Sequence, residues 1–194
     1  AVEGNLFMYH LRQLIGQGWV KKRSDGRYEL TATGQLYADK LSLKTFALRA
    51  QPKIVTLIAC QNQNGEWLFY RRKRQPLMGL CGFPYGKVHE GEKIQASAKR
   101  ELQEKTGLTA ELKHRGDGYI WIYQDGGLVS EVLFHLFAGT NPTGTLKKKT
   151  PIGTCFWAKA EKMSGPDFIP SGKDLMELMN TQKDHFFVEL TYNL

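Results

Sequence analysis

The stretch that decides the fold is Gly86-Lys-Val-His-Glu-Gly-Glu92-Lys-Ile-Gln-Ala-Ser-Ala-Lys-Arg100-Glu101-Leu-Gln-Glu104-Lys105-Thr-Gly107-Leu108. A loop containing glycine leads into a predicted helix that begins at Glu92 and ends at Gly107. The charged residues at positions 100, 101, 104 and 105 recur three and four apart, which places several charges on one helical face. Such a face can hold a hard cation, because Mg²⁺ prefers carboxylate oxygens. The alternative is a solvated amphipathic helix with internal ion pairs.

The spacing in this stretch resembles the Nudix box. The box pattern is Gly, five residues, Glu, seven residues, and then Arg-Glu-apolar-x-Glu-Glu-x-Gly-apolar. The matching positions are Gly86, Glu92, Arg100, Glu101, Leu102, Glu104, Gly107 and Leu108. The resemblance implies an α+β fold over about residues 51–194, built as a Nudix-like α/β/α sandwich with a mixed sheet.

The resemblance also implies a chemistry. Nudix enzymes usually cleave the diphosphate of a nucleoside diphosphate that is linked to another group, with water attacking phosphorus. Carried over by position, Glu101 and Glu104 would bind Mg²⁺ or Mn²⁺ and take part in catalysis, and Arg100 would orient a glutamate of the helix. Glu92 would brace the loop or contribute to metal binding, and the carbonyl of Gly86 would be a further metal ligand. The substrate and the transition state both carry clustered negative charge, which a bound metal cation would stabilise.

Lys105 departs from the box, because the family usually has a metal-binding glutamate there. An ammonium group has no lone pair and cannot ligate a metal while protonated. Its charge also opposes a second or third Mg²⁺. Tyr85 and His89 are further departures, at positions where the family usually has Gly and often has Glu. We expect a weakened metal site, or a site in which Lys105 contacts a ligand phosphate in place of a metal.

A basic run, Arg71–Arg74, lies just before the loop that leads into the box. Arg72 and Arg74 are candidate phosphate contacts, and the alternative is a charged strand end. Within the following loop, Cys81-Gly-Phe-Pro is similar to a cysteine context of isoprenoid diphosphate isomerases, a remote third interpretation. A lone cysteine is more often inert.

The first 50 residues carry eight Lys and Arg against four acidic residues. Residues 5–20 predict an amphipathic helix, Asp25-Gly26 a hairpin turn, and Thr31 or Thr33 the cap of a second helix. Helix, basic hairpin and helix is the order found in winged helix-turn-helix domains. Residues 1–50 resemble part of such a unit, without its first one or two helices.

In that interpretation, residues of the first helix face a DNA groove and residues of the hairpin meet phosphates. The candidates are Tyr9, Arg12, Lys21, Lys22, Arg23 and Arg27. The alternative is a solvated remnant that serves packing or homodimer formation.

Composition sets the broad class of protein. The chain has 194 residues, 41% of them hydrophobic, and a net charge of +8 that favours polyanionic partners. No apolar run approaches the ~20 residues that a membrane helix needs, so we expect no membrane partner. Three isolated cysteines and an N-terminus without secretory features favour the cytoplasm.

Three hypotheses follow. The first is a Mg²⁺-dependent pyrophosphohydrolase of a nucleoside diphosphate derivative, with weakened activity and an accessory N-terminal unit. The second is a DNA-binding transcription regulator whose Nudix-like domain senses a nucleotide-type ligand. The third is a structural or interaction module.

Overall fold

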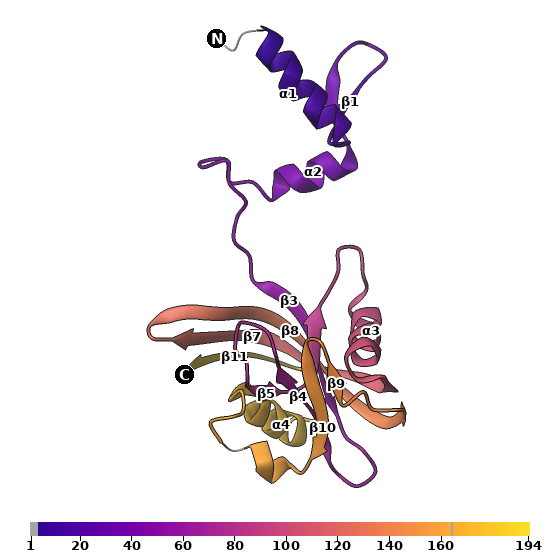
Figure 1. Cartoon of the computed structure of the whole chain (residues 1–194), viewed down its shortest axis with the longest axis vertical. Coiled ribbons are helices and arrows are strands. Elements are labelled where there is room, and N and C mark those ends of the chain that lie inside the picture. Colours follow the sequence, from indigo (N-terminus) through magenta and orange to yellow (C-terminus); the bar gives the residue numbers. More distant parts are fainter. Residues whose placement is uncertain (1–3, 164) are drawn as a thin grey trace. The chain divides into compact units, whose positions relative to one another are not determined.

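The computed structural model describes residues 4–163 and 165–194. The chain forms two compact units, Ala1–Gln51 and Pro52–Leu194 (Figure 1). Among the described residues, no helix is long and apolar enough to cross a membrane.

The first unit consists of two helices and a hairpin. Its elements are α1 (Gly4–Gly16), β1 (Val20–Lys22), β2 (Tyr28–Leu30) and α2 (Ala32–Asp39). The Thr31 hydroxyl caps α2 by accepting a hydrogen bond from the Gly34 backbone N–H at 3.1 Å. Trp19 stacks on Tyr37 with ring centroids 4.1 Å apart, which fixes the hairpin against α2. The predicted order of helix, hairpin and helix is therefore confirmed.

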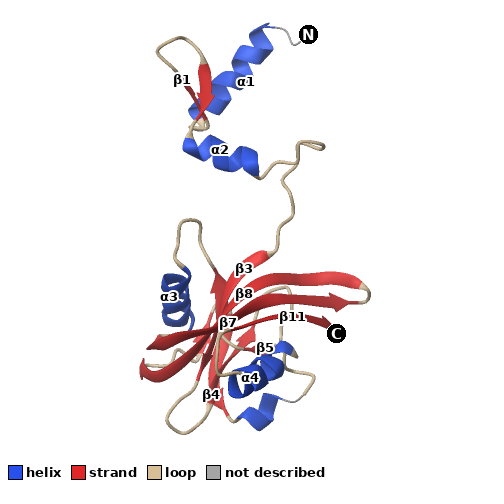
Figure 2. Ribbon diagram, turned by 180° about the vertical axis from the view of Figure 1, so that it is seen from behind, coloured by secondary structure: helices blue, strands red, loops and turns tan. Residues whose placement is uncertain are grey.

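The second unit is built on two sheets (Figures 1 and 2). The mixed five-stranded sheet has the order β11-β7-β8-β3-β6, in which β3 pairs with β8 and β7 with β11 in parallel. Its strands are β3 (Lys53–Cys60), β6 (Tyr85–Lys87), β7 (Leu108–Gln124), β8 (Gly127–Gly144) and β11 (Phe186–Asn193). The antiparallel sheet has the order β5-β4-β10-β9. Its strands are β4 (Trp67–Arg72), β5 (Cys81–Gly82), β9 (Lys149–Thr150) and β10 (Gly153–Ala158).

Two helices, α3 (Ile94–Thr106) and α4 (Ser171–Thr181), cover opposite faces of the mixed sheet. Side chains alternate between faces along a strand, and β3 shows the alternation directly. Val55 and Ala59 pack into one core with Leu175 of α4, whereas Ile58 packs into a second core with Leu102 of α3. This arrangement confirms the predicted α+β sandwich with a mixed sheet. A short 3₁₀ turn, Ala160–Met163, precedes α4.

The predicted start of the box helix at Glu92 is wrong. The helix begins at Ile94, since the backbone of Lys93 is still extended. Glu92 lies in the preceding loop, where its carboxylate accepts a hydrogen bond from the His89 backbone N–H at 3.0 Å. The predicted end is correct: Gly107 has a φ of 75°, a left-handed conformation that glycine adopts at the end of a helix.

Strand β11 lies so close to β7 that one position of β7 has no room for a side chain. A Cβ added at Gly118 would lie 1.9 Å from the backbone oxygen of Val188. Glycine is therefore required there, because the obstructing atom belongs to the neighbouring backbone.

We predict that Gly118→Ala lowers the free energy of unfolding of the chain by ~1–3 kcal/mol, the usual cost of overpacking. Urea unfolding of the full chain measures it. The matched control is Gly127→Ala, where the nearest atom is 3.5 Å away. Both changes restrict the unfolded chain equally, so the difference between them reports the clash. Equal unfolding midpoints for the two variants would contradict the close approach of β11.

Candidate functional site

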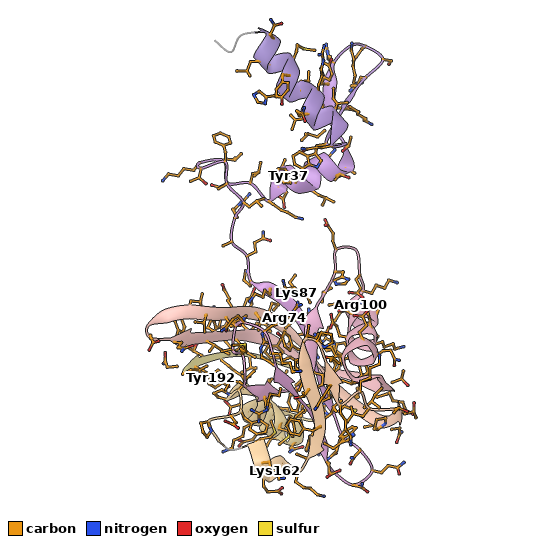
Figure 3. All side chains as sticks on the ribbon, viewed as in Figure 1. Tyr37, Arg74, Lys87, Arg100, Lys162 and Tyr192 are labelled. Atoms are coloured by element: carbon orange, nitrogen blue, oxygen red, sulfur yellow. The ribbon has the colours of Figure 1, made fainter. Side chains whose placement is uncertain are left out.

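A basic cavity of about 430 Å³ lies beside the box. Five of the described lining residues are cationic and one is a carboxylate: Lys53, Arg72, Arg74, Lys87, Lys105 and Glu101. They come from β3, β4, β6, α3 and the loop after β4. Figure 3 labels Arg74, Lys87 and the neighbouring box residue Arg100. This surplus of positive charge fits an anionic ligand.

Arg100 holds the loop before α3 to the helix. Its Nε lies 2.7 Å from Glu92 Oε1 and its Nη2 lies 2.8 Å from Glu92 Oε2, a bidentate ion pair. Nη2 also donates to the Lys87 carbonyl at 3.0 Å. The hydrogen bonds to Glu92 from Arg100 and then from the His89 backbone lower the pKa of Glu92 to about 2. Glu92 is therefore ionised at neutral pH and engaged by Arg100.

Glu101 is shared by two cations. Its side chain is buried, with the residue 6% exposed, and its Oε1 lies 2.7 Å from Arg100 Nη1. Its Oε2 lies 2.8 Å from Lys105 Nζ. Both oxygens of this carboxylate are therefore in ion pairs.

Lys105 points into this cluster and away from solvent. Besides pairing with Glu101, its ammonium group donates to the carbonyl of Tyr85. It also lies 4.8 Å from the ring centroid of Tyr85 and 5.9 Å from that of Tyr70. A carboxylate, a carbonyl and two aromatic faces are the surroundings that stabilise a cation. The position of Lys105 in the box thus holds a resident positive charge.

Gly86 makes room for this arrangement. A Cβ at this position would lie 1.7 Å from Glu101 Cδ. The absence of a side chain lets the carboxylate of α3 rest against the backbone of β6. This close approach accounts for the glycine at the start of the box.

The carboxylates do not fit a divalent cation in the observed arrangement. Both oxygens of Glu92 and both of Glu101 already face cations. Glu104 is 62% exposed and makes one long contact, 3.4 Å, to Arg100 Nη1. A metal ion at Glu101 would have to displace the ammonium group of Lys105. In the observed arrangement Lys105 therefore occupies a position beside Glu101 that a metal ion would need, and the metal-binding role of Glu92, Glu101, Glu104 and Gly86 stays a prediction.

Arg72 has a hydrogen-bonding group without an acceptor. The residue is 8% exposed, its guanidinium lies 4.8 Å from the ring centroid of Tyr85, and Nη1 donates to the Tyr85 hydroxyl. Its Nε is buried and has no partner among the residues that the structure describes. A buried N–H without an acceptor is costly, so Arg72 is suited to an anionic ligand that supplies one.

An apolar cavity of about 70 Å³ adjoins the basic one. The two share Arg72 and Tyr85, and the apolar cavity continues between Phe83, Ile120 and Leu175. A ligand held in the basic cavity can therefore also contact apolar side chains at this edge.

Three residues of this site were not predicted from the sequence. Lys53 belongs to no motif, Lys87 lies in the box at a position that the box pattern leaves open, and Tyr85 is only a departure from the box. Burial, followed by the nearby charges of Lys87 and Arg72, lowers the pKa of Lys53. That mutual repulsion shows how closely the cations are gathered. No local signal in the sequence marks them, since strand pairing brings Lys87 opposite Val55 of β3.

Cys81 does not have the surroundings of a nucleophile. It is fully buried, and burial raises the pKa of its thiol. A reactive cysteine needs an exposed and stabilised thiolate.

The DNA-binding candidates lie on exposed parts of the first unit, Tyr9 and Arg12 on α1 and the four basic residues on or beside the hairpin. Lys21 lies 3.1 Å from Glu29, and Arg23 lies 3.5 Å from Asp25. These pairs reduce the positive charge that the hairpin presents. The role of all six residues stays a prediction.

Several curated proteins match short stretches of this chain, among them the following two. An ADP-ribose pyrophosphatase of Methanocaldococcus jannaschii is 29% identical over 90 residues, covering 44% of this chain and 53% of the relative. An RNA pyrophosphohydrolase of Caulobacter vibrioides is 44% identical over 55 residues, covering 28% of this chain and 31% of the relative. The matched part of the chain thus spans about half and about a third of these relatives.

Solved structures share the fold. The MutT protein of Bacillus halodurans has a TM-score of 0.60 at 24% identity, covering 73% of this chain and 90% of that one. The NUDIX domain of Shewanella oneidensis NrtR, complexed with ADP ribose, has a TM-score of 0.57 at 16% identity, covering 78% and 97%. The family model of the NUDIX domain matches residues 51–177, which is more than half of the chain. The chain therefore belongs to the Nudix family.

Proposed function

We propose that the Nudix domain binds the diphosphate group of a nucleotide-type molecule in the basic cavity, with Lys105 supplying positive charge in place of a metal ion. The observation that carries this proposal is the ion pair of 2.8 Å between Lys105 Nζ and Glu101 Oε2 at the cavity wall. Nudix hydrolases generally use divalent metal ions. Here a covalently attached ammonium group lies where such an ion would pair with Glu101.

The remainder of the cavity supports the same ligand. Arg72 offers its buried Nε to a phosphate oxygen, and Arg74, Lys53 and Lys87 add charge around it. The adjoining apolar cavity offers apolar contacts to an uncharged part of the ligand. A similar curated protein is named an ADP-ribose pyrophosphatase, and a domain of similar fold is complexed with ADP ribose. ADP-ribose is therefore a suitable probe.

Hydrolysis of the diphosphate is the second candidate function. Two observations favour it. The chain retains the box network formed by Gly86, Glu92, Arg100 and Glu101, and the carboxylate of Glu104 is exposed. Such a reaction by the family's Mg²⁺ chemistry would require Lys105 to leave Glu101. The resulting enzyme would be a slow pyrophosphohydrolase.

The first prediction for this site concerns binding without metal. ADP-ribose should bind the wild-type chain in EDTA, and Lys105→Met should weaken that binding by about 10- to 100-fold, because one charge-assisted contact is lost. Calorimetry measures both affinities. The control is Lys99→Met on the same helix, where the side chain is exposed and lies outside the cavity lining. A strict need for Mg²⁺ in wild-type binding would refute the proposal.

The second prediction separates binding from hydrolysis. Lys105→Glu reverses a charge near the ligand, so ADP-ribose binding should be lost and no product should form with Mg²⁺ or Mn²⁺. In a weakened enzyme, the same change would restore a carboxylate and raise turnover. Phosphate-containing products are followed by chromatography, with Lys99→Glu as the charge-matched control. A gain of turnover would support the hydrolase in place of the binding domain.

We further propose that the first unit binds duplex DNA, which would make the chain a regulator that responds to the ligand of its Nudix domain. The proposal is supported by the exposed hairpin, in which Lys22 and Arg27 extend the basic surface beyond the paired Lys21 and Arg23. Phosphate contacts by such residues supply affinity without base specificity.

DNA binding of this kind predicts a steep dependence on salt. The logarithm of the affinity should fall by about 0.9 for each phosphate contact per tenfold increase in salt. Replacement of Lys21, Lys22 and Arg23 by alanine should flatten the slope, as measured by fluorescence anisotropy with a labelled duplex. The control replaces Lys147, Lys148 and Lys149, a basic run outside the first unit. No duplex binding at low salt, or an unchanged slope, would exclude this role.

A further inference from the structure

A second cluster of polar side chains lies apart from the basic cavity. Three histidines surround Asp117: His114 Nε2 lies 2.7 Å and His135 Nδ1 lies 2.6 Å from its Oδ1, and His185 Nε2 lies 2.8 Å from its Oδ2. Three of the five histidines of the chain are thus gathered on one carboxylate. No part of the Nudix box contributes to this cluster.

An irregularity in β7 brings His114 and Asp117 together. Residues three apart on a regular strand point to opposite faces. Between His114 and Gly116 the register with β8 shifts by one residue, because His114 pairs with Phe137 and Gly116 pairs with Leu136. The extra residue restores both side chains to the same face, as a β-bulge does.

Strand pairing supplies the other two histidines. His135 of β8 pairs directly with Asp117 of β7. His185 immediately precedes β11, whose first residue, Phe186, pairs with Gly116. Segments from three parts of the chain therefore meet at this point.

The surroundings hold these side chains in place. The His114 ring stacks on the buried ring of Phe137 at 4.8 Å and meets His185 edge to face at 4.7 Å. The bulged residue Arg115 donates to the carbonyls of Met179 at 3.0 Å and Gln182 at 2.7 Å, which fixes the segment that leads to His185. The cluster is accordingly supported on both sides.

We propose that His114, Asp117 and His185 form a binding site for a divalent transition metal of the Zn²⁺ class. One ligand atom from each residue lies within 4.8 Å of the others. A metal with bonds of about 2.0–2.2 Å to nitrogen and oxygen needs only small side-chain rotations to be bound there. Two imidazoles and one carboxylate form a donor set that suits such metals and that Mg²⁺ does not favour.

The arrangement also provides the outer parts of a metal site. His135 donates to Asp117 and would orient this ligand, as outer hydrogen bonds commonly do in metal sites. The side chain of His185 is 49% exposed, so a metal ion can enter from solvent and retain water. Bound metal would join the beginning of β11 to β7 and would therefore stabilise the C-terminal strand.

This site is distinct from the Nudix box. Strand pairing relates the two sites across the sheet. Gly86 of β6 pairs with Thr56 of β3, Thr56 pairs with His135 of β8, and His135 pairs with Asp117 of β7. Three strand spacings separate the position at which Glu101 rests from Asp117, a distance of about 14 Å. Metal binding at the histidines can therefore be tested independently of ligand binding in the cavity.

The test titrates the full chain, freed of metal with EDTA and dialysed, with Zn²⁺ in the presence of millimolar Mg²⁺. We expect one saturable site and a higher melting temperature. His185→Gln can keep a hydrogen bond to Asp117 but removes the imidazole, so Zn²⁺ affinity should fall at least tenfold. His135→Ala should weaken binding by about 10- to 100-fold. The control is His10→Ala in the first unit, which should bind Zn²⁺ as the wild type does.

Titration with Co²⁺ supplies a readout that does not depend on stability. Coordination by imidazole and carboxylate should give visible absorption bands in the wild type, and the bands should be absent in His185→Gln and His114→Gln. Circular dichroism without metal establishes that these variants are folded. If Zn²⁺ neither binds the wild type nor raises its melting temperature, the cluster only links the strands by hydrogen bonds and the proposal is overturned. Equal Zn²⁺ binding by His185→Gln and the wild type would overturn it too.

Discussion

The ion pairs of Glu101 with Arg100 and Lys105 are the interaction on which the site depends. A buried carboxylate needs compensating charge, and Glu101 receives it from both sides, at 2.7 Å and 2.8 Å. Arg100 extends the same network to Glu92 and to the backbone of β6. The ion pairs of the box thus hold α3, the loop before it and β6 together, whether or not the box binds a metal.

Lys105 changes the balance of charge in this network of ion pairs. A glutamate at this position would leave the cluster negative and open to cations, whereas lysine leaves Glu101 neutralised and the cavity wall positive. Four further cationic side chains add positive charge around the cavity: Arg72, Arg74, Lys53 and Lys87. The fold of a Nudix domain is retained, while the site is better suited to holding anionic groups than to collecting Mg²⁺.

Much of the fold could be predicted from the sequence because its signals are local. Glycine and charge spacing located the box helix, and Asp25-Gly26 located the hairpin. The start of the helix was misplaced by two residues because Glu92 is bound by Arg100 from outside the helix. The sites were only partly predictable, because strand pairing assembles them from distant parts of the chain. It brings Lys53 and Lys87 to the basic cavity and, separately, gathers three histidines around Asp117. A bulge such as that at Arg115 has no reliable mark in a single sequence.

A crystal structure of the chain with ADP-ribose, grown in the presence of Mg²⁺, would test directly whether Lys105 takes the place of a metal ion. We predict a phosphate oxygen within hydrogen-bonding distance of both Lys105 Nζ and Arg72 Nε. We also predict that Lys105 remains paired with Glu101 and that no metal lies between them. A Mg²⁺ ion bound by Glu101 and Glu104, with Lys105 turned away, would contradict these predictions.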